Sequence, residues 1–180
     1  MDFFEAVKAR YSHKQALDPN RPVAKEDLAK IVEAGMAAPS AGNGQSPEFV
    51  VIDDPELLAK LRPLHDNVPF STAPAMVALL TKPRVRETLD IQTECLLCDL
   101  AAATQNVLLA AAALGYCGGW LDSPFTDVDV RSKAQAILGI PEDRMLLLVV
   151  PIGYPGEEGE RRVKKPFAER ASWNGYSVQR

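Results

Sequence analysis

The sequence predicts an α+β protein, because helical patterns and short apolar runs alternate along it. Apolar runs of strand length lie at residues 49–52, 75–80 and 145–152. Apolar residues at helical spacing lie over residues 25–37 and 87–114. The 180 residues are enough for one domain with a sizeable core. We therefore expect a single domain over residues 1–180, in which residues 156–180 form a C-terminal arm.

The first half of the chain has recognisable start and stop signals. Asp2 and Glu5 have the spacing of a capping box, for a helix that runs out near Ala9. The helix over residues 25–37 stops before Pro39, which lacks the backbone N–H of a helical residue. After the strand at 49–52 we expect a brief helix over 56–61, an irregular connection over 62–74 and a buried strand over 75–80.

The second half is organised around the helix at 87–114, which Gly115 ends. This helix is apolar on nearly every face, as is typical of a helix in a core or at a subunit interface. Asp99 and Asn106 share one of its faces, and they need hydrogen-bond partners if they are buried.

A Gly-rich, strand-like segment follows at 116–121. Thr126-Asp127-Val128-Asp129 has the pattern of a cap for the next helix, which ends at Gly139 and leads to the strand at 145–152. Beyond this strand the chain is acidic, then basic, and it ends with two aromatic residues, Trp173 and Tyr176. We expect this arm to pack on another surface.

The composition is that of an ordinary globular protein and excludes several classes. Hydrophobic residues make up 47% and charged residues 24% of the chain. The net charge of −4 lacks the basic excess of a general nucleic-acid binder. The first residues lack a signal-peptide pattern, and no apolar run reaches the roughly 18 residues of a membrane span. Three cysteines do not form a disulfide framework. We expect a cytoplasmic protein with no nucleic-acid or membrane partner.

Two segments are candidates for ligand binding. If residues 10–14 are extended, Arg10, Ser12 and Lys14 project to the same side. Two cations and a hydroxyl would then form an anion site, for which phosphate is the obvious ligand. The alternative is a polar strand on the surface.

The second candidate is the loop over residues 38–49. Gly42 and Gly44 permit positive φ or a close approach of the backbone to a ligand. Ser40, Asn43 and Gln45 offer hydroxyl and amide groups without charge, which suits a neutral, polar or heterocyclic ligand. The alternative is a solvated turn.

Common catalytic patterns are missing from the sequence. Two histidines and no carboxylate cluster at metal spacing argue against a zinc or two-metal site. Gly42-x-Gly44 lacks the third glycine and the strand-before-helix context of a dinucleotide fingerprint. Cys95-x-x-Cys98 lies within the long helix, where core packing explains it better than redox chemistry. No side chain obviously carries a reaction, so we expect a bound cofactor to supply it.

Four motifs, in this order, resemble the nitroreductase family of flavoproteins. They are Arg10-x-Ser12-x-Lys14; Ala38-Pro39-Ser40-x-x-Asn43-x-Gln45; the segment from Asp99 through Asn106 and Leu114-Gly115-Tyr116 to Trp120-Leu121; and Ile152-Gly153-Tyr154-Pro155 with the basic patch after it. The resemblance covers essentially the whole chain. It implies a three-layer α/β/α fold with a central mixed, mostly antiparallel sheet, in an intertwined homodimer.

The resemblance also implies FMN bound at the dimer interface. Arg10 and Ser12 would hold its phosphate, with Lys14 near the phosphate or the ring and with Lys164 or Lys165 completing the phosphate site. The loop would approach the same flavin from the partner subunit, and Asp122 and Ser123 would lie near its N5 atom. The implied cofactor-binding residues are Arg10, Tyr11, Ser12, Lys14, Pro39, Ser40, Ala41, Asn43, Gln45, Asp122, Ser123, Lys164 and Lys165.

The chain departs from the family pattern at two of these places. Ser46-Pro47 follows Gln45 where the family often has Pro-Trp, and Asp122-Ser123 replaces an Ile/Glu-Gly type of sequence. The connection over 62–74 is also compact. The exchange at Ser46-Pro47 changes the wall beside the flavin, and the compact connection predicts a more open site.

The resemblance implies an NAD(P)H:acceptor oxidoreductase in which flavin N5 carries hydride to a nitroaromatic, a quinone or a similar small molecule, by a ping-pong mechanism. No catalytic side chain and no metal is needed. One alternative is a specialised reductive step such as dehalogenation or alkene reduction. Others are a non-redox flavin-binding module and an α-helical interaction protein whose loop and basic tail are structural.

Overall fold

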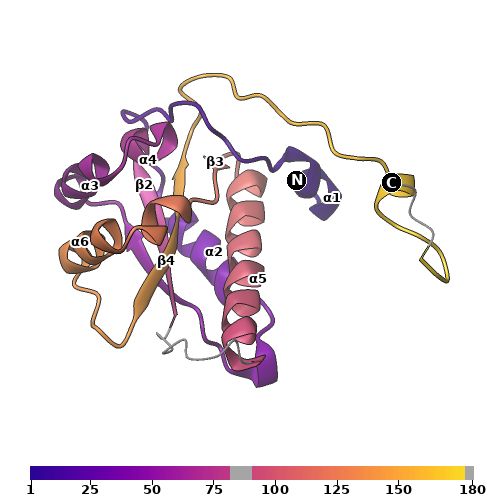
Figure 1. The fold of residues 1–180 in the computed structure, drawn as a ribbon. Helices are drawn as coiled ribbons and strands as arrows, with labels where there is room; N and C mark the ends of the chain where they lie inside the picture. The colour runs from indigo at the N-terminus through magenta and orange to yellow at the C-terminus, as the bar shows by residue number, and fades with distance from the viewer. Residues whose placement is uncertain (82–90, 177–180) are drawn as a thin grey trace.

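The computed structural model describes residues 1–81 and 91–176, and its centre is a four-stranded sheet (Figure 1). The strands are β1 (Glu48–Ile52), β2 (Ala75–Thr81), β3 (Cys117–Gly118) and β4 (Met145–Gly153), in the order β1-β2-β4-β3. All three strand pairs are antiparallel. The parallel component is a single bridge between Ser12 and Gly118.

Helices cover both faces of the sheet. On one face lie α2 (Lys25–Met36) and α5 (Ile91–Ala113), and on the other lie α3 (Pro55–Leu61), α4 (Val68–Thr72) and α6 (Val128–Leu138). Strand side chains alternate, and β2 is buried along its whole length, so it contributes to both layers. Its odd-numbered residues, such as Val77, pack with α2 and α5, and its even-numbered ones, such as Ala78, pack with the opposite layer. The predicted α+β, three-layer architecture is confirmed.

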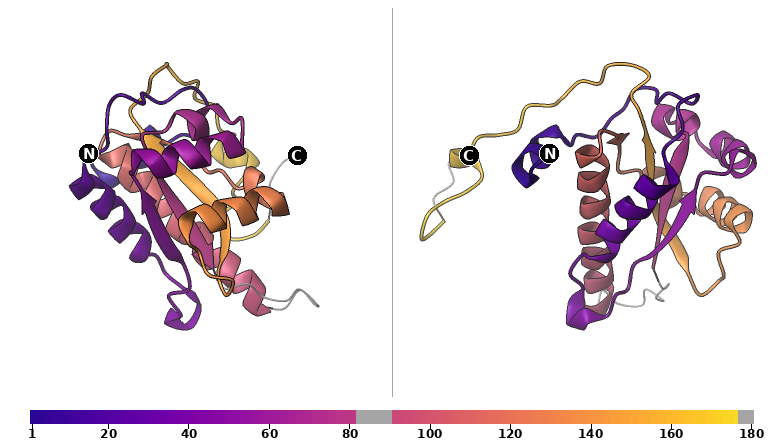
Figure 2. Two further views of the ribbon diagram at one scale, coloured as in Figure 1. Left: turned by 90° about the vertical axis from the view of Figure 1, so that its left-hand side faces the viewer. Right: turned by 180° about the vertical axis from the view of Figure 1, so that it is seen from behind.

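The two ends of the chain project from this body, as the two views of Figure 2 show. Helix α1 (Phe3–Ala9) has the predicted capping box, since Glu5 N donates to Asp2 Oδ1 and Asp2 N donates to Glu5 Oε2, each at 2.9 Å. After β4 the chain runs without strands through a short 3₁₀ helix, η4 (Phe167–Glu169). Residues 156–176, the described part of the predicted arm, are called the arm below.

Helix α5 packs against α1, α2 and the sheet, which explains its apolar sequence. Its predicted start near residue 87 lies outside the described residues. Cys95–Ala113 is long and apolar enough to cross a membrane by length and composition. Asp99, Gln105 and Asn106 interrupt this segment, 44% of it is buried in the fold, and a buried core helix passes the same test. Asn106 on this helix is half-buried and donates to the Ala34 carbonyl at 3.0 Å.

Two local predictions are also corrected. Residues 62–74 are not irregular but contain a 3₁₀ helix, η2 (Arg62–Leu64), and α4, which Asn67 caps by accepting from Phe70 N at 3.2 Å. The cap of α6 is Asp127 rather than Thr126, because the Asp127 carboxylate accepts from the N–H groups of Asp129 and Val130.

Candidate functional site

The N-terminal candidate segment, residues 10–14, is extended and lies beside β3. His13 N donates to the Gly118 carbonyl at 3.1 Å, next to the Ser12–Gly118 bridge. Tyr11 Oη lies 3.1 Å from His13 Nδ1, so these two side chains share the inner side of the segment. Alternation directs Ser12 and Lys14 to the outer side, where both are exposed, while Arg10, at the end of α1, is half-buried.

The arm docks on this segment through Arg161. Its Nη1 donates to the Lys8 carbonyl at 2.7 Å, and its guanidinium carbon lies 4.8 Å from the centroid of the Tyr11 ring. Burial, together with the neighbouring Cys117, raises the pKa of the Tyr11 hydroxyl, and burial raises the pKa of the Cys117 thiol. Both groups are therefore neutral at physiological pH. Sequence reasoning did not select Arg161, since it lay unmarked in a basic run.

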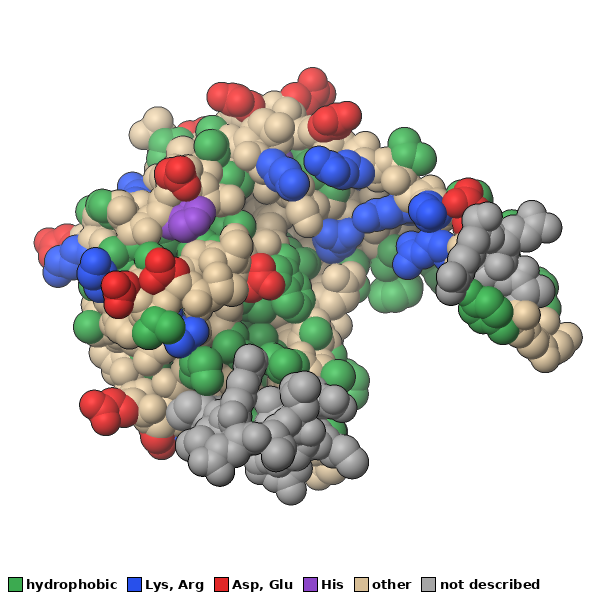
Figure 3. Space-filling view, viewed as in Figure 1, with side chains coloured by type: hydrophobic (Ala, Val, Ile, Leu, Met, Phe, Trp, Pro, Cys, Tyr) green, Lys and Arg blue, Asp and Glu red, His purple; other side chains and the backbone are tan. Residues whose placement is uncertain are grey.

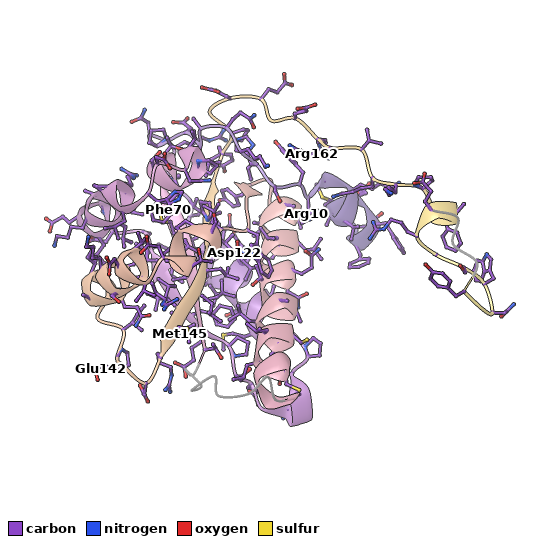
Figure 4. The ribbon with its side chains drawn as sticks, in the orientation of Figure 1. Arg10, Phe70, Asp122, Glu142, Met145 and Arg162 are labelled. Carbon is purple, nitrogen blue, oxygen red and sulfur yellow. The ribbon has the colours of Figure 1, made fainter. Side chains whose placement is uncertain are left out.

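The predicted tail cations lie further along the arm. Lys165 pairs with Glu169 at 3.5 Å, and Lys164 is exposed. Among the described arm residues, Arg161 is the cation that hydrogen-bonds to residues 8–14. Lys and Arg side chains gather along the arm where it leaves the body (Figure 3), and Arg10 and Arg162 are labelled there in Figure 4.

Asp122 and Ser123 follow β3 and are held against β4. Leu121 N donates to the Val149 carbonyl at 3.1 Å, and the 3₁₀ helix η3 (Ser123–Thr126) begins directly after Asp122. Asp122 lies at a cavity of about 520 Å³, whose lining is mostly apolar: Leu97, Leu100, Trp120, Asp122, Phe125, Thr126, Arg131, Met145, Leu147 and Leu148. The Ser12–Gly118 bridge places β3, which leads into this segment, beside residues 10–14.

The loop with Pro39, Ser40, Ala41, Asn43 and Gln45 lies elsewhere. It contains the 3₁₀ helix η1 (Ala41–Asn43), and Ala41 N donates to the Asp99 carboxylate near the start of α5 at 2.8 Å. φ is positive at Gly42, as expected for one of the two glycines, and also at Asn43 and Gln45, but not at Gly44.

The two candidate segments are at opposite ends of α5. Arg10 lies with Leu108 and Ala112 around a small cavity near the C-terminal end of this helix. Asp99, which holds the loop, is 13 residues before Ala112, a distance of about 20 Å at 1.5 Å per residue. One chain therefore joins residues 10–14 with 117–123, but it does not join them with the loop.

Comparisons with known proteins agree with this fold. The model of the nitroreductase family matches residues 7–84 and 64–154, which together span most of the chain. The chain belongs to the nitroreductase family. A protein of Archaeoglobus fulgidus, provisionally named an NADH dehydrogenase/NAD(P)H nitroreductase, is 34% identical to this family member over 158 residues, which cover 86% of the chain and 87% of the relative.

Two further similar proteins match a larger share of the chain. An NADPH-dependent oxidoreductase of Staphylococcus haemolyticus is 27% identical over 97% of the chain and 74% of its own length. A crystal structure from Parabacteroides distasonis, with the same provisional name as the Archaeoglobus protein, superposes with a TM-score of 0.77. It is 27% identical and covers 97% of this chain and 98% of its own.

Proposed function

We propose that the protein is an FMN-dependent NAD(P)H oxidoreductase that reduces an electron-poor small molecule, such as a nitroaromatic or a quinone. The observation that carries the proposal is the outer side of residues 10–14. Ser12 and Lys14 are exposed there beside half-buried Arg10, and within the described residues neither cation is neutralised by an ion pair. Two such cations and the Ser12 hydroxyl fit a phosphate monoester. Family membership and the names of the relatives support the same assignment.

The positions of the two candidate segments support a site shared between two chains. A ligand that touches both Arg10 and the loop of a single chain would have to span much of α5, whereas a second copy can supply the loop. A homodimer with the flavin between its subunits is therefore part of the proposal.

The residues of the site orient and enclose the ligands. When bound, FMN would accept and donate hydride at its N5 atom. Arg10, Ser12 and Lys14 would hold its phosphate, and the backbone at Asp122 and Ser123 would lie beside its ring. The apolar cavity at Asp122 has room for a planar substrate. No acid or base side chain is required.

A single pocket for the nucleotide and the acceptor predicts ping-pong kinetics, because the two substrates cannot bind together. The chain carries no dinucleotide fingerprint that would build a separate nicotinamide site. Initial rates against NAD(P)H at several fixed quinone concentrations should give parallel reciprocal plots, with excess acceptor competing against the nucleotide. Intersecting plots with a demonstrable ternary complex would rule out the shared pocket.

A spectrum of the purified protein tests the proposal most directly. We expect a yellow protein that retains FMN in preference to FAD and that NADH or NADPH bleaches under anaerobic conditions. A protein that binds no flavin refutes the proposed function. Flavin that neither nucleotide reduces favours a non-redox flavin-binding module instead. Comparing nitroaromatic, halogenated and enone acceptors would separate general reduction from dehalogenation and alkene reduction.

Arg10→Ala tests the phosphate assignment. A hydrogen bond to a charged group contributes about 1.5–3 kcal/mol, so the change should weaken FMN binding by roughly ten- to a hundredfold. Riboflavin, which lacks the phosphate, should bind to the variant and the wild type almost equally. Titration of flavin fluorescence measures both affinities. Equal losses for FMN and riboflavin would show that Arg10 is structural.

A further inference from the structure

The loop before β1 has an unusual backbone. Asn43 and Gln45 have φ values of 56° and 45°, and Gly42 between Ala41 and Asn43 has a φ of 56°. Left-handed conformations cost free energy in residues that carry a Cβ, and such residues keep them only where the surroundings determine them. The loop is exposed from Ala41 to Gln45, so core packing does not supply this constraint.

The side chain of Asp99 on α5 supplies the constraint on the loop backbone instead. Its side chain is buried, with 6% of the residue surface exposed. One carboxylate oxygen accepts from Ala41 N at 2.8 Å, and the other accepts from Ser46 Oγ at 2.7 Å. The carboxylate thus holds both ends of the segment 41–46. Inside the segment, Gln45 N donates to Ser40 Oγ at 2.9 Å.

We propose that Asp99 is a positioning residue, whose two hydrogen bonds to Ala41 and Ser46 hold the loop in the shape that receives the flavin ring. This inference rests on the proposed function, since the loop is assigned to a flavin bound mainly by a second subunit. It goes beyond that function because it assigns a role to a buried carboxylate that lies away from the phosphate-binding residues. Through the loop, Asp99 would set the affinity of the site for the flavin ring.

The exchange of Asp99 for asparagine separates hydrogen bonding from charge. In Asp99→Asn, the amide oxygen can still accept from Ala41 N, and the amide NH₂ can donate to Ser46 Oγ, because a hydroxyl also accepts. Asp99→Ala removes both bonds, and Ser46→Ala removes one of them without changing the buried residue. Cys98→Ala is the control, since Cys98 is the exposed neighbour of Asp99 on the same helix.

Flavin titration of these four variants tests the inference. Asp99→Ala should weaken FMN and riboflavin by the same factor, about tenfold or more, because the loop acts on the ring and not on the phosphate. Ser46→Ala should show a smaller loss of the same kind, and Asp99→Asn and Cys98→Ala should resemble the wild type. If Asp99→Ala does not fold, Ser46→Ala still decides the matter.

Hydrogen exchange of the flavin-free protein gives a second readout. Peptides that cover residues 38–48 should exchange faster in Asp99→Ala and Ser46→Ala, while peptides of β2 should not change. The inference is overturned if the flavin affinities or the loop exchange of both variants equal those of the wild type, if FMN alone is affected, or if Asp99→Asn is as impaired as Asp99→Ala. A wild-type protein without flavin affinity refutes the proposed function instead, and the exchange experiment still shows whether Asp99 holds the loop.

Discussion

Gly159 is the point at which the arm fits against residues 10–14. A Cβ built at this glycine would lie 2.7 Å from Tyr11 Oη and 2.7 Å from His13 Nδ1, two atoms that contact each other. His13 is buried, and the half-buried Tyr11 also contacts Cys117, so moving either ring disturbs existing contacts. Only a residue without a side chain fits here as the chain is folded.

Gly159→Ala should therefore loosen the root of the arm. Overpacking costs about 1–3 kcal/mol, which corresponds to fivefold or more in the opening equilibrium that a protease samples. We expect trypsin to cleave after Arg161 and Arg162 at least about fivefold faster in this variant, as measured by the time course of limited proteolysis. Gly175→Ala is the matched control, since a Cβ there would meet nothing within 4 Å. Equal cleavage rates in the two variants would contradict the contact.

At the scale of elements, α2 and α5 approach closely at Gly35. A Cβ at this position would lie 2.8 Å from Val107 Cγ2 on α5 and 3.0 Å from Phe49 Cε1 on β1. The glycine therefore sets how near the two helices lie on the sheet, in spite of its poor helix propensity.

Gly35→Ala should destabilise the protein although alanine favours helices. The cost of overpacking, about 1–3 kcal/mol, exceeds or offsets the propensity gain of about 1 kcal/mol. Thermal unfolding should show a lower Tm for the single variant. In a double-mutant cycle, Val107→Ala should cost less in the Gly35→Ala background than in the wild type, because it removes a group that the new methyl meets. A single variant that is more stable than the wild type would show that the helices can separate without cost.

Tyr116, just after α5, is tied to the first turn of α2. Its hydroxyl donates to Asp27 Oδ2 at 2.9 Å, and Lys30 donates to Oδ1 at 2.9 Å. The Lys30 and Tyr116 hydrogen bonds hold the pKa of Asp27 below its usual value of 3.8. A lowered pKa means that ionised Asp27 stabilises the fold above its unfolded pKa, and this contribution is lost as pH falls through the folded pKa.

Tyr116→Phe should therefore reduce stability in a pH-dependent way. The pKa of Asp27 rises toward its usual value in this variant, so the stability gap to the wild type should be constant near neutral pH and should shrink below about pH 4. Urea unfolding between pH 3 and pH 7 measures the gap. In an Asp27→Asn background the gap should not vary over this range. A gap that widens toward low pH would reverse the assigned sign.

The sequence predicts elements well where the signal is local. The strands at β1, β2 and β4 are apolar runs, and Asp2 and Gly139 mark helix ends by their own chemistry. Helix α4 was missed because Val68–Thr72 is too short to show a helical period. It is stabilised by the Asn67 cap and by burial of Phe70 against Phe125, which is a tertiary contact.

The same reasoning applies to the candidate site. The donors of residues 10–14 and the turn at Gly42 are visible in the sequence, because residue type alone indicates them. Arg161 contacts residues 153 positions away, and the Asp99 carboxylate contacts the loop 58 positions before it. Such partners are set by the packing of α5 and the arm, which no local pattern records.

At the scale of the whole molecule, α1 and the arm leave large apolar side chains uncovered. Phe3 and Phe4 are 64% and 73% exposed, and Phe167 and Trp173, which stack on each other, are 58% and 80% exposed. Scattered exposed hydrophobics are ordinary, but these lie together on two projecting segments (Figure 2). In the proposed homodimer, we expect the second copy to cover these side chains and to supply the loop beside Arg10.

We therefore expect the 180-residue protein to sediment as a dimer in the presence of FMN. Phe167→Ser combined with Trp173→Ser should raise the dimer dissociation constant at least about a hundredfold, taking about 2 kcal/mol for each buried aromatic anchor. The same double change should weaken FMN binding, because the site would lose the loop of the partner. Val128→Ser is the matched control, since this residue is 61% exposed on α6, away from α1 and the arm. A holo protein that sediments as a monomer, or a double variant that remains dimeric with unchanged FMN affinity, would show that the arm does not hold a partner.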